Sequence, residues 1–292
     1  MRVPTMKGVV ERRLLINYRL DPDVAATMIP APFPPQLVNG WVVAGICLIR
    51  LGHMRPRGVP ARLGLTSENA AHRFAVQWHD EAGLRTGVYI PTRHSAAIVN
   101  VAVGDRLFPG RHERADFISA ESADAVSVAF TARHSHCFVD AAVEMRDELT
   151  DSELFASTAE ASNFFRAGAA GFSPTRRSAK LDGLELRTAN WRIQAADIHH
   201  VRSSFFDDPV AFPAASIRLD SALVMRDVEV EWHSLDSIAA GQRRRSRTEY
   251  LGRSLTRERD VTPAAVSVAD LASFADTFAD LADPEVIDRA WR

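Results

Sequence analysis

The segment SENAAHR, residues 67–73, places a carboxylate, an imidazole and a guanidinium within six positions: Glu68, His72 and Arg73. Glutamate and histidine transfer protons in many active sites, and arginine binds a carboxylate through two parallel hydrogen bonds. In a strand, His72 and Phe74 would share one face and Arg73 would lie on the other. We therefore predict Glu68 and His72 as catalytic acid/base residues and Arg73 as a substrate-binding residue. The alternative is a salt-bridged strand end.

Three further arginines stand where a ligand site could form. Arg93 follows the end of an expected strand, and Arg166 and Arg202 each adjoin a pair of phenylalanines. We predict that all three bind substrate and that Arg166 and Arg202 approach a common cavity, where they could hold a carboxylate. The alternatives are a solvated turn for Arg93, and helix carbonyls or a buried acid such as Asp207 as partners of the other two.

Metal and phosphate motifs are weak in this chain. His134 and His136 would share one face of a strand, but a zinc site needs a third and usually a fourth ligand, and no suitable spacing follows. The sequence contains no glycine-rich phosphate loop and no G-x-S-x-G elbow. We therefore predict neither a metal nor another cofactor.

Composition limits the class of protein. The 292 residues are 46% hydrophobic and 25% charged, with a net charge of −2, which is ordinary for a globular protein and indicates no bulk attraction to nucleic acid or to a membrane. Cys47 and Cys137 lie in apolar runs, which favours buried free thiols in a reducing compartment. No signal peptide or membrane-spanning run is apparent, so we expect a cytoplasmic protein.

Periodicity predicts a protein made mainly of antiparallel β-structure with a few helices. Alternating or continuous apolar runs indicate strands, and their hairpin spacing favours a sheet that curls toward a barrel or a sandwich. Such runs occupy residues 9–20, 41–51, 72–78, 82–90, 125–133, 136–145, 184–191, 192–198 and 216–232. A helix is predicted over residues 95–107. Another should begin at a capping box formed by Thr150 and Glu153 and end near Gly168.

After Trp232 the sequence changes from strand-like apolar runs to a polar, basic composition. We predict a β-barrel domain over residues 1–235, a polar basic linker over 236–260 and a helical tail over 261–292. The linker's few arginines are too sparse to indicate nucleic-acid binding. The tail could dock on a partner or support a homo-oligomer.

Five stretches of the sequence carry a resemblance to a known family: LDPDVAATMIPAPFPPQLVNGWVVAGICLIRL, GLTSENAAHRFAVQW with GVYIPTRHS, LFPGRHERADF, ASNFFRAGAAGFSP and VRSSFFDDPVAFP. They resemble the YqjF-like family, a domain-of-unknown-function family of the acetoacetate decarboxylase-like superfamily. The resemblance covers about residues 12–232. It implies an α+β fold that is mainly antiparallel β: a cone-shaped, partly closed barrel with a central cavity and a few flanking helices.

The chain departs from the decarboxylase pattern in its lysines. The decarboxylase reaction uses a lysine Schiff base activated by a neighbouring cation. Only Lys7 and Lys180 among the 35 basic residues here are lysines, and neither lies beside another lysine or within an apolar run. Arginine cannot replace a deprotonatable amine.

Together these observations predict a β-barrel that binds a small molecule, in particular a small carboxylate. It could be an enzyme that acts on an organic (oxo) acid by acid/base chemistry without a Schiff base. A non-catalytic ligand-binding or sensing module, and an assembly protein that uses its tail, remain open alternatives. A cavity lined by arginine with glutamate or histidine favours the enzyme, a cavity with arginine alone favours the binding module, and a filled barrel favours the assembly protein.

Overall fold

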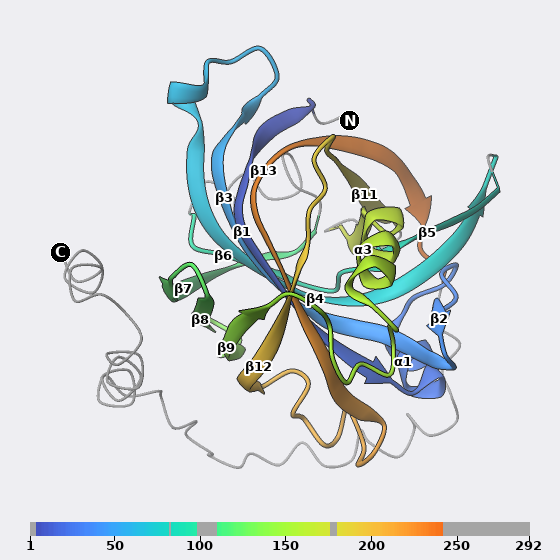
Figure 1. Cartoon of the computed structure of the whole chain (residues 1–292). Coiled ribbons are helices and arrows are strands. Elements are labelled where there is room, and N and C mark those ends of the chain that lie inside the picture. Colours follow the sequence, from blue (N-terminus) through green and yellow to red (C-terminus); the bar gives the residue numbers. More distant parts are fainter. Residues whose placement is uncertain (1–3, 82, 98–109, 176–179, 242–292) are drawn as a thin grey trace. The chain divides into compact units, whose positions relative to one another are not determined.

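The computed structural model describes residues 4–81, 83–97, 110–175 and 180–241. The expected helix over 95–107 lies almost wholly outside the described residues, and the expected tail over 261–292 lies wholly outside them. The strands in the described residues form one sheet (Figure 1). They are β1 (Met6–Leu20), β2 (Leu37–Val38), β3 (Trp41–Pro56), β4 (Leu65–Asp80), β5 (Gly83–Tyr89), β6 (Arg93–Ser95), β7 (His112–Glu121), β8 (Ala125–Ala132), β9 (Phe138–Arg146), β10 (Ala170–Pro174), β11 (Lys180–Arg187), β12 (Gln194–Ser203) and β13 (Ile217–Ala239).

The sheet closes on itself twice. Its order is β11-β10-β5-β4-β6-β7-β8-β9-β12-β13-β1-β3-β2, with additional pairings of β11 with β13 and of β4 with β3. A larger circuit therefore runs through β4, β6, β7, β8, β9, β12, β13, β1 and β3. A smaller circuit runs through β4, β5, β10, β11, β13, β1 and β3. The two circuits share a wall made of β13, β1, β3 and β4, so this wall has an interior on each side.

A wall with two interiors explains the apolar run near the start of the chain. Residues 42–48 of β3 are all buried, because neither face of this strand meets solvent. One hydrophobic cluster, which includes Leu14, Ile46, Phe74 and Phe130, spans the larger circuit and continues to Phe172 of β10 and Leu181 of β11. A second cluster, which includes Leu15 and Phe165, lies on the opposite face of the wall and joins it to helix α3 (Thr158–Ala167).

In the described residues the helices are few: α1 (Pro22–Met28), a 3-10 turn η1 (Ala61–Leu63) and α3. The predicted start of α3 is wrong. Its N-cap is Ser157, whose side chain accepts a hydrogen bond from the Glu160 amide, while the Glu160 carboxylate accepts one from the Ala156 amide. This S-x-x-E box lies seven residues after the expected one. The predicted end at Gly168 is confirmed.

Two other local predictions need correction. His134 and His136 lie in the exposed turn between β8 and β9, not on a strand face, so alternation does not align their rings. The barrel domain also continues beyond residue 235, because β13 pairs with β11 up to Ala239.

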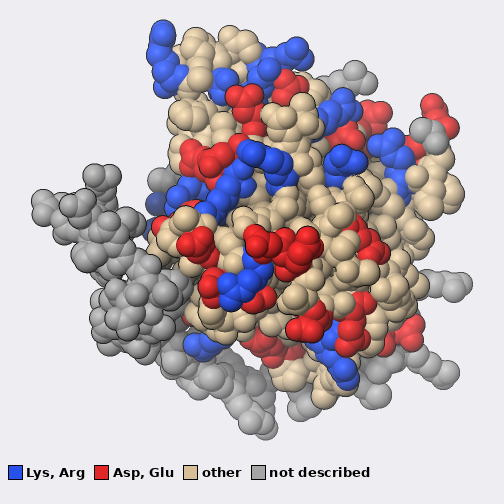
Figure 2. Space-filling model, viewed as in Figure 1, with Lys and Arg blue, Asp and Glu red and all other residues tan. Residues whose placement is uncertain are grey.

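One face of the described part of the chain is mixed in charge. Figure 2 shows arginine and lysine side chains interspersed with aspartate and glutamate on the face in view. Within the residues that the structure describes, no helix is both long enough and apolar enough to cross a bilayer.

Candidate functional site

The smaller circuit encloses a cavity of about 130 Å³. Each of its seven strands contributes to the lining, together with residues from β6, from β7 and from the segment that joins α3 to β10. The lining residues are Arg13, Cys47, Ile49, Leu51, Asn69, Ala70, Ala71, Arg73, Val88, Ile90, Arg93, His94, His112, Gly168, Ala169, Gly171, Leu184, Leu186 and Trp232. Three arginines and no aspartate or glutamate appear among these described residues. The cavity is therefore electropositive, with apolar walls.

Arg73 is the most deeply buried of the three arginines, at 2% exposure. Its Nη2 donates a hydrogen bond to Asn17 Oδ1 at 2.6 Å, and Asn17 Nδ2 donates to Ser221 Oγ at 3.3 Å. The guanidinium also lies 4.7 Å from the centre of the Phe165 ring on α3. Its Nε and Nη1 atoms have no hydrogen-bond partner among the described residues. Burial lowers the pKa of Arg73 to about 9, so it stays charged at neutral pH.

The other two arginines approach the same space from different strands. Arg93 stands at the start of β6 and is half-buried, and burial lowers its pKa to about 10. Arg13 on β1 donates a hydrogen bond from Nε to Cys47 Sγ at 3.4 Å. Cys47, on β3, is 9% exposed and is a free thiol. The cavity therefore combines guanidinium donors with one thiol.

The two buried histidines near the cavity are neutral at physiological pH. His94 lines the cavity, and burial lowers its pKa to about 4, although Glu113, 3.8 Å from Nε2, opposes that shift. His72 lies on the far face of β4, with its ring stacked 4.4 Å from Phe205, and burial lowers its pKa to about 3. Burial disfavours the charged imidazolium in both cases.

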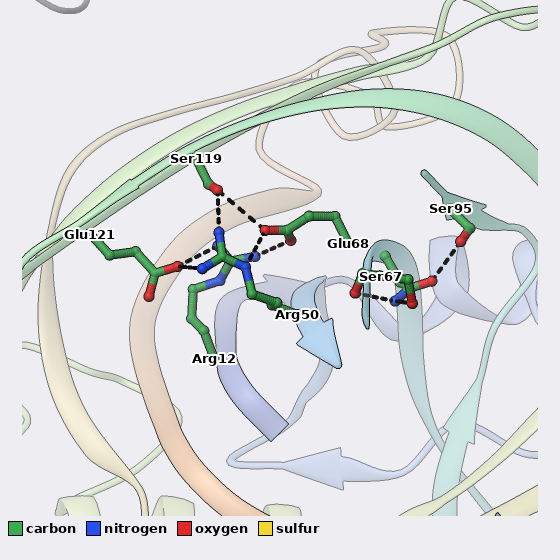
Figure 3. Close-up of polar contacts among 8 residues, drawn as sticks. Arg12, Arg50, Ser67, Glu68, Ser95, Ser119 and Glu121 are labelled. Atoms are coloured by element: carbon green, nitrogen blue, oxygen red, sulfur yellow. Dashed lines mark hydrogen bonds and ion pairs between the residues drawn. The ribbon is translucent and has the colours of Figure 1, made fainter. Parts of the chain in front are cut away.

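Glu68 belongs to an ion-pair network inside the larger circuit (Figure 3). Its carboxylate pairs with Arg12 and accepts hydrogen bonds from Arg50 Nε at 2.8 Å and Ser119 Oγ at 3.2 Å. Glu121 accepts from Arg12 Nη1 and pairs with Arg50 Nη1, both at 3.0 Å. Two arginines and two glutamates thus neutralise one another.

The structure therefore separates the predicted SENAAHR constellation. Arg73 faces the cavity, while Glu68 and His72 face the larger circuit. Alternation along β4 predicted that His72 and Arg73 lie on opposite faces, but not which of them meets the cavity. His72 Nε2 lies 3.4 Å from Ser203 Oγ, and Glu68 is bound by the two arginines of the network. Geometry does not place these two residues as an acid/base pair at the cavity.

Arg166 and Arg202 do not line the cavity, contrary to the expected convergence. Arg166 projects from the exposed side of α3, because Phe165 takes the buried side. Arg202 is exposed on β12 and lies 5.7 Å from the centre of the Phe138 ring. Adjacent phenylalanines did not indicate a shared site: Arg166 lies on the exposed side of α3 while Phe165 is buried, and Phe205 and Phe206 follow the end of β12, which carries the exposed Arg202.

Neither lysine reaches the cavity lining. Lys7 pairs with Glu231 at 2.8 Å, and Lys180 is exposed at the start of β11. In the described part of the chain, no group of three or more histidine, cysteine, aspartate or glutamate residues is placed to hold a metal ion.

Sequence reasoning missed Arg13, Cys47 and Asn17 as site residues. Their signal was alternation: Arg13 and Asn17 share a face of β1, and Cys47 pairs with Leu15 and Ala71 across β3. Assigning that face to a cavity requires the β11–β13 pairing that closes the smaller circuit. That pairing joins segments about fifty residues apart and leaves no local trace in the sequence.

Solved structures with this architecture are similar to the chain in fold. An acetoacetate decarboxylase-like enzyme from Sphingomonas wittichii RW1 superposes with a TM-score of 0.52 at 13% identity, covering 82% of this chain and 93% of that one. Acetoacetate decarboxylase from Legionella pneumophila gives 0.54 at 10% identity, covering 82% and 88%. The enduracididine biosynthesis enzyme MppR, complexed with pyruvate, gives 0.53 at 12% identity, covering 82% and 91%. The expected acetoacetate decarboxylase-like fold is thereby confirmed.

Two comparisons of sequence give matches of very different length. Antitoxin VapB2 of Mycobacterium tuberculosis is 38% identical over 73 residues, which are 25% of this chain and 99% of the antitoxin. A far longer stretch, residues 9–220, matches a family described as DUF2071, Uncharacterized conserved protein (COG2071), and this confirms the YqjF-like resemblance. With most of its length inside that match, the chain belongs to the DUF2071 family.

Proposed function

We propose that this protein binds a small carboxylate in the cavity of the smaller circuit, with Arg73 and Arg93 as the anion-binding residues. The observation that carries the proposal is the buried Arg73 guanidinium, whose Nε and Nη1 have no partner among the described residues. An uncompensated buried charge costs several kcal/mol. A bound carboxylate would supply both missing acceptors through the two parallel bonds that arginine favours.

The walls and the volume of the cavity suit a small ligand. Ile49, Val88 and Leu184 offer apolar contacts for a short carbon chain. Drug-sized ligands occupy sites of roughly 300–1,000 Å³, so about 130 Å³ restricts the ligand to an acid of a few carbons. The pyruvate bound to MppR is an acid of this size and guides the choice of probe.

The cavity supports binding better than it supports decarboxylation. No lysine is among the described lining residues, so the proposal involves no Schiff base. Of the expected acid/base residues, Glu68 is held in its ion network and His72 faces the larger circuit. His94 and His112 line the cavity beside the arginines, so an acid/base enzyme stays the alternative. We propose a ligand-binding module because burial lowers the pKa of His94 to about 4 and makes it a weak base at neutral pH. A proton-transfer role for Glu68 and His72 stays a prediction.

The test is isothermal titration of the full chain with pyruvate. Arg73→Met keeps an unbranched side chain but removes the charge, and it should weaken pyruvate binding by at least tenfold, about 1.4 kcal/mol. Arg166→Met is the matched control, because Arg166 is an exposed arginine outside the cavity, and it should bind like the wild type. Equal weakening in both variants, or no pyruvate binding by the wild type up to 10 mM (about −2.7 kcal/mol), would contradict the proposal.

A second function is favoured by the antitoxin match. The family match ends at residue 220, so residues 221–292 lie beyond it, and the antitoxin-like stretch has nearly that length. We infer that this C-terminal part binds a protein partner in the manner of an antitoxin. β13 takes residues 217–239 into the sheet, so the partner-binding part would follow Gly241.

Co-expression tests this second function with a defined partner. The toxin that Antitoxin VapB2 counteracts is expressed with the full chain or with a chain that ends at Gly241. The full chain should co-purify with the toxin and restore growth, and the shortened chain should do neither. Failure of the full chain with a soluble toxin would refute the partner while leaving the carboxylate site untouched.

A further inference from the structure

Cys47 shares the cavity with three arginines. Its Sγ accepts a hydrogen bond from Arg13 Nε at 3.4 Å, and Arg73 and Arg93 line the same space. The thiol is 9% exposed, and its exposed part faces the cavity that it lines. Any small molecule in the cavity would therefore lie near a sulfur atom.

A second observation supports an anion as the ligand of the cavity. Arg73 is buried and has two unpartnered donor atoms, Nε and Nη1, among the described residues. No described aspartate or glutamate in the lining competes for them. A cleft walled by one sign of charge raises the local concentration of the opposite ion by roughly 10–1,000-fold. The arginines would hold an anionic reagent beside Cys47.

We propose that Cys47 is a nucleophilic thiol that reacts selectively with small carboxylates carrying an electrophilic carbon. The inference rests on the proposed carboxylate site and adds a covalent step to it. With iodoacetate, the sulfur attacks the methylene carbon, a C–S bond forms, the C–I bond breaks, iodide leaves and the thiol proton goes to solvent. The arginines bind the carboxylate and do not enter the bond changes.

Cys137 is an internal reference in the same chain. It is half-buried and lies outside the cavity lining, and burial raises the pKa of its thiol. The full-length protein is treated with equal concentrations of iodoacetate or its neutral analogue iodoacetamide, and the alkylation of each cysteine is followed by peptide mass spectrometry. The ratio of the iodoacetate rate to the iodoacetamide rate should be at least about tenfold higher at Cys47 than at Cys137.

Variants and a competitor assign this selectivity to the arginines. Arg73→Met or Arg93→Met should bring the Cys47 rate ratio close to that of Cys137, whereas Arg166→Met should leave it unchanged. Excess pyruvate should slow the reaction of wild-type Cys47 with iodoacetate and spare Cys137. This competition needs no substitution, so it remains informative if a variant fails to fold.

Two results would overturn the inference in different ways. If Cys47 reacts with neither reagent while pyruvate still binds by titration, the thiol is not a nucleophile and the carboxylate site stands. If Cys47 reacts with both reagents at the ratio seen for Cys137, the arginines do not gather anions, and both the inference and the proposed function fail.

Discussion

At the scale of single residues, His72 and His94 link the stability of the barrel to pH. Burial lowers their pKa values to about 3 and about 4, whereas an unfolded histidine titrates near 6.5. Both are therefore neutral in the folded protein at pH 5, while the unfolded chain binds two more protons. Their contribution to stability is complete above pH 6.5 and is lost as the pH falls toward 4.

Thermal and urea melts should show this loss directly. Lowering the pH from 7 to 5 should remove about 2 kcal/mol of unfolding free energy per histidine. His72→Phe keeps an aromatic ring against Phe205 but removes the titrating group. Between pH 7 and pH 5 this variant should lose about 2 kcal/mol less unfolding free energy than the wild type. His134→Gln, at an exposed turn position, serves as the control and should follow the wild type. Parallel pH profiles for all three proteins would show that His72 titrates normally.

The ion network around Glu68 leads to a second residue-scale prediction. Arg12 is fully buried and forms ion pairs with two carboxylates, one of which belongs to Glu68. Glu68→Gln should therefore lower the unfolding free energy by roughly 3–5 kcal/mol, because it leaves a buried charge under-compensated. Asp116→Asn removes the partner of Arg133 in an exposed pair and should change stability little. A mild effect of Glu68→Gln in urea melts would show that the network does not support the fold.

The alternation of side chains along β4 made their orientation partly predictable from the sequence. The opposite orientation of Arg73 from His72 and Phe74 follows from the period of a strand, and the structure confirms it. The burial of Glu68 against Arg12 did not follow, because those residues meet only after β1, β3 and β4 pair in register. Alternation assigns side chains to the two faces of a strand, but it does not identify the residues of other strands that they contact.

At the scale of elements, α3 begins at a capping residue and carries a side chain that contacts a cavity arginine. Ser157 caps the helix, and Phe165, two turns later, stacks on the Arg73 guanidinium. The sequence predicted both the helix and its glycine end but chose an earlier box. Thr150 and Glu153 have the right spacing, but residues 151–157 turn before the helix begins, with Asp220 binding the Ser152 hydroxyl.

Paired substitutions distinguish the two boxes. Ser157→Ala should lower the unfolding free energy by about 1 kcal/mol, because the Glu160 amide loses its acceptor. Thr150→Ala, at an exposed position outside the helix, should change it little. Urea melts of the two variants check the assignment, and a larger effect at Thr150 would restore the earlier start.

At the scale of the whole described unit, two circuits share one wall and differ in how their interiors are packed. The larger circuit is filled by a continuous apolar core and a neutralised ion network. The smaller circuit keeps its cavity and its unpartnered guanidinium atoms. Hairpin spacing predicted a curled antiparallel sheet. The double closure depends on pairings between distant strands, which periodicity does not encode.

The stability of this unit should reside within residues 4–241. The thirteen described strands and three hydrophobic clusters all lie there. A chain that ends at Gly241 should therefore keep the wild-type circular dichroism spectrum and melt within a few degrees of the full chain. A broad, non-cooperative transition would show that residues beyond 241 complete the sheet.

The proposed function requires the buried Arg73 guanidinium to bind the carboxylate of a small ligand. A crystal structure of the full chain grown with pyruvate tests it most directly. We expect the pyruvate carboxylate within about 3 Å of Arg73 Nε and Nη1, which is ordinary hydrogen-bond distance, inside the smaller circuit. The absence of pyruvate from a cavity where Arg73 is paired with a carboxylate or carbonyl of the chain itself would contradict the account.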